Sequence, residues 1–212
     1  MTEAEAKDWL VRHCHVSRET MTRLAGFAAA VIAENEHQNL ISAATIPDVW
    51  SRHIVDSAQL LRLRPEPHSA LPWLDLGTGA GFPGMVIAIL TDIPVILVES
   101  RRKRSEFLAR QAEALELDNV AVHGGRLEAL ETRSAGVISA RAFAPLPKLL
   151  ELAHRFSTEK TCWLLPKGRS AREELESVRS SWQGVFHVEP SLTDADAAII
   201  VATGVSPRKN AR

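Results

Sequence analysis

The chain has 212 residues, of which 45% are hydrophobic and 24% are charged. These fractions are typical of a soluble folded domain and exclude a disordered chain. The 25 basic and 26 acidic residues nearly cancel, so any nucleic-acid site has to be a local patch. The two cysteines, Cys14 and Cys162, lack CxxC spacing, and we therefore expect neither a disulfide framework nor a metal site.

The first part of the chain has helical periodicity. Ser17 is a suitable capping residue for a helix whose apolar positions recur at steps of three and four. Thr45 and Asp48 have the spacing of a capping box, which predicts the start of a further helix. That helix carries Trp50 and Ile54 on one apolar face. We therefore expect a small helical element at this end of the chain.

A connector rich in proline follows the helical element. The stretch RPEPHSALP, over residues 64–72, interrupts both helix and strand patterns. We therefore predict two units, an N-terminal helical element at 1–64 and a larger domain at 65–212.

The chain is expected to be cytoplasmic. Its acidic, polar start, MTEAEAKDWL, does not resemble a secretory or transit peptide. The most apolar stretch, residues 71–90, contains Asp75, four glycines and two prolines, which makes a membrane-spanning helix improbable.

After the connector, short apolar runs alternate with helical segments. The predicted strands are WLDL (73–76), VILVE (95–99), VAVH (120–123), GVISA (136–140), TCWLL (161–165), VFHV (185–188) and AAIIVA (197–202). The predicted helices lie between them, at about 84–91, 102–117, 146–156 and 171–182. This alternation predicts an α/β fold with a mostly parallel, seven-stranded sheet. The last two strands lack an intervening helix, which favours an antiparallel end and a Rossmann-like methyltransferase fold.

The strongest motif is the glycine loop LDLGTGAGFPG, at residues 74–84. A predicted strand ends at Leu76, and Gly77 and Gly79 follow it at once. Glycine is needed where a backbone turns sharply and approaches a ligand closely. The helix beyond the loop offers free amide groups at its N-terminus. The motif therefore predicts a loop that binds a nucleotide-type cofactor.

Two cofactors compete for this loop. Gly79, Gly81 and Gly84 match the GxGxxG pattern of dinucleotide-binding enzymes, whereas Asp75 begins a D-x-G-x-G-x-G pattern that suits S-adenosylmethionine. Pro83 removes an amide that a pyrophosphate would use. Asp75 would repel a pyrophosphate but attract the ammonium group of a methionine moiety. These features favour S-adenosylmethionine, with a nicotinamide-dependent oxidoreductase as the alternative.

Four further residues are candidates for cofactor contacts. Glu99 ends the second strand, where an acid accepts hydrogen bonds from both ribose hydroxyls of either cofactor. Leu127 and Glu128 follow the third strand, where backbone groups are placed to contact an adenine edge. Arg141 follows the fourth strand, the end of which faces the methyl donor. Its candidate partners are a cofactor carboxylate, a phosphate or guanine O6.

The acceptor side lacks the usual signals of two methylation chemistries. No Asn/Asp-Pro-Pro-aromatic motif for amino methylation follows the fourth strand, and neither cysteine is placed as a nucleophile for pyrimidine carbon-5. Guanine N7 already carries a lone pair, so its methylation needs alignment and no general base. We therefore expect no catalytic acid or base. Because bidentate binding of Arg141 to O6 and N7 would block N7, we predict that it does not occur.

Several cations suggest an anionic partner. Residues 101–104 are four consecutive cations at a predicted helix start, where the helix dipole disfavours positive charge. Lys167 and Arg169 would extend a basic rim, and Arg52 and His53 would form another wall. A noncatalytic RNA-binding module and a small-molecule methyltransferase are therefore further alternatives.

Together these motifs resemble one family, the RsmG family (also called GidB) of bacterial small-subunit rRNA (guanine-N7) methyltransferases. The matching segments are NLISA (39–43), WSRHIVDS (50–57), LDLGTGAGFPG (74–84), VESRRKRSEFL (98–108), GRLEAL (125–130), SARAFAPLPKLL (139–150) and LLPKGR (164–169). They occur in the order of the family and cover most of the chain.

The resemblance implies methylation of one guanosine in the decoding-region loop of 16S rRNA, with S-adenosylmethionine as donor. It implies cofactor contacts at Gly77, Phe82, Leu127, Glu128 and Arg141, which we combine with Asp75, Gly79 and Glu99. It implies RNA contacts at Lys103, Arg104 and Lys167, to which we add Arg141. The substrate is either free rRNA or a small-subunit particle, and a monomer without an obligate protein partner is expected.

The chain departs from the family at two positions. Many members carry Asp where Glu99 stands, which keeps the carboxylate, and Pro166 precedes Lys167 where many members have another residue. The proline is expected to alter how Lys167 is presented, without changing the activity.

Overall fold

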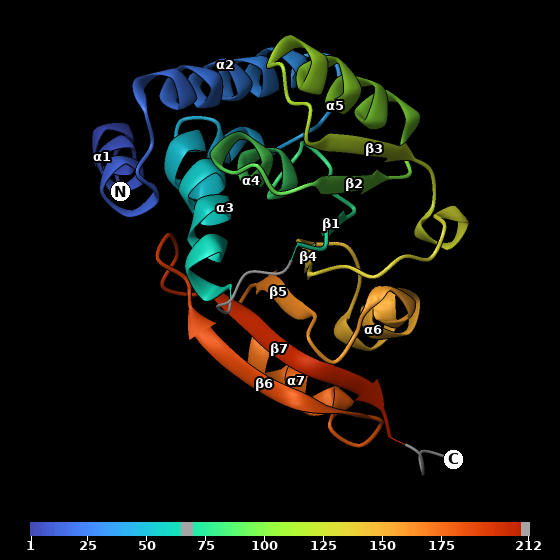
Figure 1. Ribbon diagram of the computed structural model, residues 1–212. Coiled ribbons are helices and arrows are strands. Elements are labelled where there is room, and N and C mark those ends of the chain that lie inside the picture. The colour runs from blue at the N-terminus through green and yellow to red at the C-terminus, as the bar shows by residue number, and fades with distance from the viewer. Residues whose placement is uncertain (65–69, 209–212) are drawn as a thin grey trace.

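A seven-stranded sheet forms the centre of the computed structural model, which describes residues 1–64 and 70–208 (Figure 1). Its strands are β1 (Trp73–Leu76), β2 (Val95–Glu99), β3 (Val120–Gly124), β4 (Val137–Ala140), β5 (Cys162–Lys167), β6 (Trp182–Pro190) and β7 (Ala198–Pro207). Their order is β3-β2-β1-β4-β5-β7-β6. Strands β1 to β5 pair in parallel, whereas β7 is antiparallel to both β5 and β6. The predicted fold class, including its antiparallel end, is confirmed.

Helices cover both faces of the sheet. The α-helices are α1 (Glu3–Cys14), α2 (Arg18–Glu34), α3 (Asp56–Ala58), α4 (Gly84–Leu90), α5 (Arg102–Ala114), α6 (Leu146–Ala153) and α7 (Ala171–Val178). The shorter 3₁₀ and π segments are η1 (Ala43–Thr45), η2 (Trp50–Val55), η3 (Gln59–Leu63), η4 (Leu127–Ala129) and η5 (His154–Phe156).

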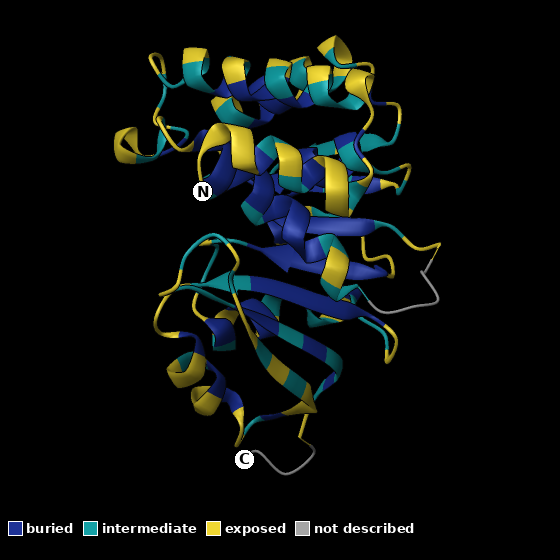
Figure 2. Cartoon of the chain, turned by 90° about the vertical axis from the view of Figure 1, so that its left-hand side faces the viewer, coloured by how far each residue is buried: buried dark blue, intermediate teal, exposed yellow. Residues whose placement is uncertain are grey.

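Alternate residues of the central strands face different helix layers. On β1, Trp73 packs into a core shared with α1 to α5, whereas Leu74 packs into a second core shared with α6 and α7. Period-two alternation places successive side chains on opposite faces of a sheet. Figure 2 shows the result, with buried strands between helices whose outer faces are exposed.

The N-terminal helices belong to the first of these cores. Phe27 and Ile54 are fully buried and share one cluster with Trp73 and Met85 of the larger unit. The predicted boundary at 64/65 adjoins residues 65–69, which lie outside the described part of the chain. The division into two domains therefore stays a prediction, although apolar packing crosses it.

The predicted helix capped by Ser17 is confirmed, whereas the predicted start of the next helix at Thr45 is wrong. Ser17 caps α2, and its hydroxyl accepts a hydrogen bond from the Thr20 amide. Thr45 caps no helix, because its hydroxyl donates to the carbonyl of Ser42 and contacts His53 instead. The helix begins at Trp50, with Val49 as its uncapped N-terminal neighbour.

The C-terminal hairpin extends further than its apolar runs predict. Trp182, expected at the end of a helix, instead opens β6 and pairs with Pro207. Helix α7 consequently ends at Val178. Among the described residues, no helix is long and apolar enough to cross a membrane. The apolar stretch at 71–90 forms β1, the glycine loop and the buried helix α4.

Candidate functional site

The glycine loop joins β1 to α4 at the carboxyl end of the parallel strands. Gly77 and Gly79 have φ angles of +62° and +59°, a left-handed conformation that L side chains rarely adopt. A side chain at Gly81 would place its Cβ 2.7 Å from Met85 and 2.8 Å from Phe27. The loop therefore needs glycine for its turns and for close packing against α2 and α4.

Asp75 anchors this loop from inside the sheet. One carboxylate oxygen accepts a 3.0 Å hydrogen bond from the Gly84 amide, and the other accepts a 2.6 Å bond from Ser139. Asp75 is fully buried, and burial raises its pKa to about 6. Because the carboxylate is not exposed, it offers no surface for the predicted contact with a methionine ammonium. It instead holds the loop against α4.

Glu99 lies beside the loop, as its position at the end of β2 predicts. Its carboxylate accepts hydrogen bonds from the amides of Gly79 (3.0 Å) and Arg101 (2.7 Å). Glu99 is 5% exposed, so the acid is held against the backbone and not solvated. This arrangement fixes the tip of the glycine loop to the neighbouring strand.

The third cofactor segment forms the short η4 turn after β3. Leu127 is buried, and its carbonyl accepts a 2.6 Å hydrogen bond from Arg155. The neighbouring Glu128 is exposed. Both residues lie at the same sheet edge as the loop, and their predicted contact with adenine stays a prediction.

Phe82 links the loop to the N-terminal helices. Its buried ring stacks on His53 at 4.9 Å between centroids and packs against Phe27 at 5.4 Å. The guanidinium of Arg141 lies 5.3 Å from the centre of the same ring. Phe82 thus joins three separate elements at the predicted reaction centre.

Arg141 and His53 form a defined hydrogen-bonded chain. Arg141 donates to Nδ1 of His53 at 3.1 Å, so the remaining ring hydrogen lies on Nε2, 2.9 Å from the Thr45 hydroxyl. Burial, followed by the positive charges of Arg141 and Arg52, lowers the pKa of His53 to about 3. His53 is therefore a neutral hydrogen-bond acceptor for Arg141.

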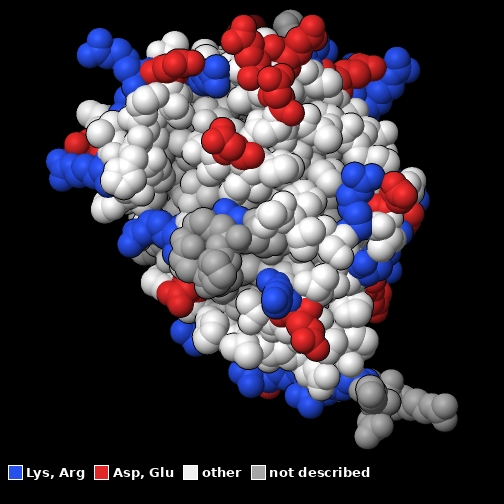
Figure 3. Space-filling model, in the orientation of Figure 1, with Lys and Arg blue, Asp and Glu red and all other residues white. Residues whose placement is uncertain are grey.

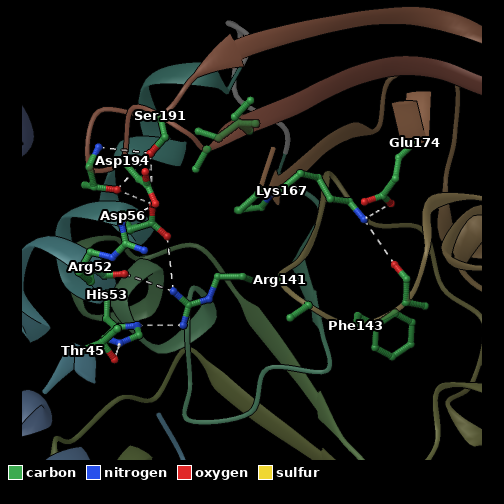
Figure 4. A pocket seen from close by; sticks show the side chains of 18 of the residues that line it. Thr45, Arg52, His53, Asp56, Arg141, Phe143, Lys167, Glu174, Ser191 and Asp194 are labelled. Carbon is green, nitrogen blue, oxygen red and sulfur yellow. Dashed lines mark hydrogen bonds and ion pairs between the residues drawn. The ribbon is translucent and has the colours of Figure 1, made fainter. Parts of the chain in front are cut away.

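A cavity of about 820 Å³ opens beyond Arg141 (Figure 4). It lies between the segment that carries Arg52, His53 and Asp56, the loops after β4 and β5, and the β6–β7 connection. Its lining residues include Arg141, Phe143, Lys167, Glu174, Ser191, Thr193 and Asp194. The cavity lies at the carboxyl ends of β4 and β5, where ligands bind in sheets of this kind.

Phe143 connects the cavity with the glycine loop. It lines the cavity, and a Cβ placed on Gly77 would lie 2.5 Å from its ring. The glycine loop and the cavity therefore adjoin each other, separated by the Phe143 side chain.

Three ion pairs line the cavity. Arg52 pairs with Asp194 at 2.6 Å, Lys167 with Glu174 at 2.8 Å, and Arg141 with Asp56 at 3.4 Å. The Arg52–Asp194 and Arg141–Asp56 pairs join segments that are distant in the sequence, whereas Lys167 and Glu174 lie seven residues apart on β5 and α7. The sequence drew attention to the cations but missed Asp56 and Asp194. The four-residue spacing of Arg52 and Asp56 suggests a local pair, but Arg52 pairs with Asp194 and Asp56 with Arg141.

The predicted RNA-contact residues do not form one continuous rim. Lys103 is exposed on α5, whereas Arg104 donates to the carbonyl of Asn39 and lies near Gly79. The Lys167 side chain is 10% exposed and paired with Glu174 inside the cavity. Figure 3 shows cations and anions interspersed on one face of the molecule, without a broad basic field.

The strand order, the antiparallel hairpin, the glycine loop and the acid at the end of β2 together define a Rossmann-like methyltransferase. Solved structures agree with this fold. The O-methyltransferase from Bacillus cereus has a TM-score of 0.60 at 13% identity, covering 92% of this chain and 96% of that chain. A SAM-dependent methyltransferase from Aquifex aeolicus has a TM-score of 0.57 at 16% identity, covering 74% and 93%.

The family follows from sequence similarity. A family model described as rRNA small subunit methyltransferase G matches residues 20–196. A protein of Novosphingobium aromaticivorans called ribosomal RNA small subunit methyltransferase G is 56% identical, and the match covers 95% of this chain and 88% of that protein. A protein of the same name from Rhizorhabdus wittichii is also 56% identical, and the match covers 98% of this chain and 95% of that protein. The chain therefore belongs to the rRNA small subunit methyltransferase G family. It is a methyltransferase, which excludes the oxidoreductase and noncatalytic alternatives.

Proposed function

We propose that this chain transfers a methyl group from S-adenosylmethionine to N7 of one guanosine in the decoding-region loop of 16S rRNA. The observation that carries this proposal is the joining of two features at Phe143. A glycine loop suited to a cofactor lies on one side of that ring, and a cavity lined by polar groups lies on the other. Methyl transfer requires donor and acceptor to meet at such a boundary.

The loop residues fit S-adenosylmethionine. The backbone of Gly77 and Gly79 is left-handed, and a Cβ at Gly79 would make only ordinary contacts, with the Arg104 guanidinium at 3.7 Å and the Gly77 carbonyl at 3.8 Å. Glu99 accepts a hydrogen bond from the Gly79 amide, and its remaining lone pairs are proposed to accept hydrogen bonds from the ribose hydroxyls. When bound, this cofactor supplies an electrophilic methyl group on a sulfonium sulfur.

The proposed cofactor contacts are those expected from the sequence, with one change of role. Gly77, Gly79, Phe82, Glu99, Leu127, Glu128 and Arg141 are proposed to surround the cofactor. Asp75 is proposed to act indirectly, by holding the Gly84 amide and thereby the shape of the loop.

The acceptor chemistry suits a site without a general base. Guanine N7 attacks with an existing lone pair, so the chain has to orient the base and exclude water. His53 already accepts a hydrogen bond from Arg141, and burial raises the pKa of Cys162 to about 11, which disfavours a thiolate nucleophile. These properties support N7 over pyrimidine carbon-5.

RNA binding is proposed to involve Lys103 and Arg104 near the loop. Lys167 is proposed to shape the acceptor cavity, since its ammonium is paired with Glu174 and donates to the carbonyl of Ala144. The cytoplasmic location and the monomeric state stay predictions.

Transfer of tritiated methyl groups to small-subunit particles that lack the modification tests the proposal. We expect incorporation into 16S rRNA at one guanosine, with sensitivity of that site to N7-specific cleavage. Free 16S rRNA, tested in parallel, distinguishes the two forms of substrate. Methylation at another atom or another RNA, by a folded protein that binds S-adenosylhomocysteine, would contradict the proposal.

A further inference from the structure

The charges in the acceptor cavity cancel in pairs. Arg52, Arg141 and Lys167 each face a carboxylate within the cavity, and burial and neighbouring cations keep His53 neutral. A cavity built for a phosphate presents unpaired cations or free amides. This one instead presents both donors and acceptors with little net charge, which suits a neutral polar ring.

The size and walls of the cavity fit a nucleobase taken out of its stack. Its volume of about 820 Å³ is within the range of small-molecule sites and large enough for a nucleoside. Phe143, Pro145 and Pro166 supply apolar surfaces for a planar ring. Enzymes that modify a base commonly hold the extruded base by its hydrogen-bonding edge between such surfaces.

The three carboxylates differ in their capacity to bind a ligand. One Asp56 oxygen accepts from both Gln59 and Thr193, and the other faces Arg141. Glu174 accepts from Lys167, Ser170 and the Leu146 amide.

Asp194 retains the most capacity for a ligand. One oxygen accepts from Arg52 and the other from the Asp196 amide, which leaves lone pairs on both. Its side chain is also the most exposed, at 31% against 23% for Glu174 and 16% for Asp56. The hydrogen bond from Arg52 lowers the pKa of Asp194, so the carboxylate is ionised and acts as an acceptor alone.

We propose that Asp194 is a specificity-determining residue, whose carboxylate accepts hydrogen bonds from N1–H and the 2-amino group of the target guanine. Adenine has an acceptor at N1 and no 2-amino group, so it cannot make this pair of bonds. The edge bound by Asp194 lies on the opposite side of the purine from N7, which leaves N7 free to face the methyl donor. This inference rests on the proposed function, because it assumes that the acceptor is guanine.

The test compares binding of three nucleotides to protein saturated with S-adenosylhomocysteine. Dissociation constants for GMP, IMP and AMP are measured by NMR titration for the wild type, Asp194→Asn and Arg52→Gln. The phosphate is common to all three nucleotides, so differences report on the base. We expect the wild type to prefer GMP over AMP and over IMP, which lacks the 2-amino group, by about tenfold or more.

The two variants separate base recognition from the ion pair. Asp194→Asn removes the second acceptor, and we expect it to lose the preference for GMP, because an amide matches adenine at least as well. Arg52→Gln breaks the same ion pair but keeps the carboxylate, and we expect it to retain the preference. Unchanged thermal midpoints and affinity for S-adenosylhomocysteine show that both variants are folded.

Three results would overturn the inference. The first is a wild type that shows no preference for GMP, and the second is an Asp194→Asn variant that keeps the preference. The third is an Arg52→Gln variant that loses the preference as fully as Asp194→Asn does, which would indicate a structural role of the ion pair. Methyl transfer to small-subunit particles is measured separately. Transfer by the wild type together with any of these results refutes the role of Asp194 alone, whereas selective GMP binding without rRNA methylation refutes the proposed function.

Discussion

Individual residues at this site have roles set by their surroundings more than by their type. Asp75 lies within β1 and Glu99 ends β2, and both are buried acids whose carboxylates accept hydrogen bonds from amides of the glycine loop. Histidine is a common acid or base in enzymes, but His53 is held neutral by burial and two neighbouring arginines. Hydrogen bonding and desolvation therefore decide what each side chain contributes.

The neutral state of His53 predicts a pH dependence of stability. Its pKa is about 3 in the folded protein against an ordinary 6.5, so the unfolded chain binds more protons between these values. This residue's contribution to the free energy of unfolding therefore decreases as the pH falls below 6.5, by about 1.4 kcal/mol per pH unit. Asp75, whose pKa is raised to about 6, has the opposite effect: its contribution to the free energy of unfolding increases as the pH falls from about 6 to 4.

Comparison with His53→Asn isolates the histidine contribution, because Asp75 is common to both proteins. The asparagine carbonyl can still accept the hydrogen bond from Arg141. We expect the wild type to lose about 2 kcal/mol more than the variant between pH 6.5 and 5, as measured by urea unfolding. Parallel pH profiles for the two proteins would show that His53 is protonated in the folded state.

The left-handed backbone at Gly79 predicts a selective loss of cofactor binding. Gly79→Val places a β-branched side chain at a φ of +59°, which is strained by about 1–3 kcal/mol, and adds bulk where the cofactor is proposed to bind. We expect affinity for S-adenosylhomocysteine, measured by calorimetry, to fall at least tenfold. Gly26→Ala is the control, because its added Cβ makes only an ordinary contact with Leu115 and should leave affinity unchanged.

At the scale of elements, the cavity depends on loops that separate strands bring together. The β4–α6 loop carries Arg141 and Phe143, and its end is fixed by Glu174 of α7, which accepts from the Leu146 amide. Lys167 at the end of β5 bonds to the same Glu174 and to the carbonyl of Ala144. One ion pair thus holds three elements in register around the acceptor cavity.

Loss of this pair should destabilise the protein more than loss of an exposed one. Lys167→Met leaves Glu174 partly buried without its cation, and we expect a decrease of about 1–3 kcal/mol in the free energy of unfolding. The matched control is Lys148→Met on α6, because Lys148 and Glu151 are 59% and 61% exposed. That variant should change stability by less than about 0.5 kcal/mol in urea titrations. Equal effects of the two substitutions would contradict this account.

At the scale of the whole molecule, the N-terminal segment closes the site and completes the core. Phe27 and Ile54 bury apolar side chains against the same face of the sheet as Trp73 and Met85. The Arg52–Asp194 pair and the hydrogen bond from Thr193 to Asp56 then join this segment to the β6–β7 connection. The first and last parts of the chain therefore meet across the acceptor cavity.

This shared core predicts that the larger unit does not fold alone. Removing residues 1–64 exposes the face of α4 and the sheet that these helices cover, and each large apolar side chain exposed costs about 1.5–3 kcal/mol. We expect fragment 65–212 to lack a cooperative thermal transition by circular dichroism. Adding a 1–64 fragment should restore it. A cooperative, native-like transition of 65–212 alone would instead support an independent domain.

The sequence alone determined most of the strands and helices and the cofactor loop, because these depend on local periodicity and on residues adjacent in the chain. Strand alternation, the glycine spacing and Glu99 after the second strand predict a mostly parallel sheet, the cofactor loop and an acid beside that loop. The acceptor cavity was decided only by tertiary structure. The Arg52–Asp194 contact joins residues 142 positions apart, and no local pattern signals which carboxylate a cation will meet. Tertiary structure also decided the place of Lys167. The sequence predicted a cation on an exposed rim, but its side chain is mostly buried in the cavity wall, where it pairs with Glu174.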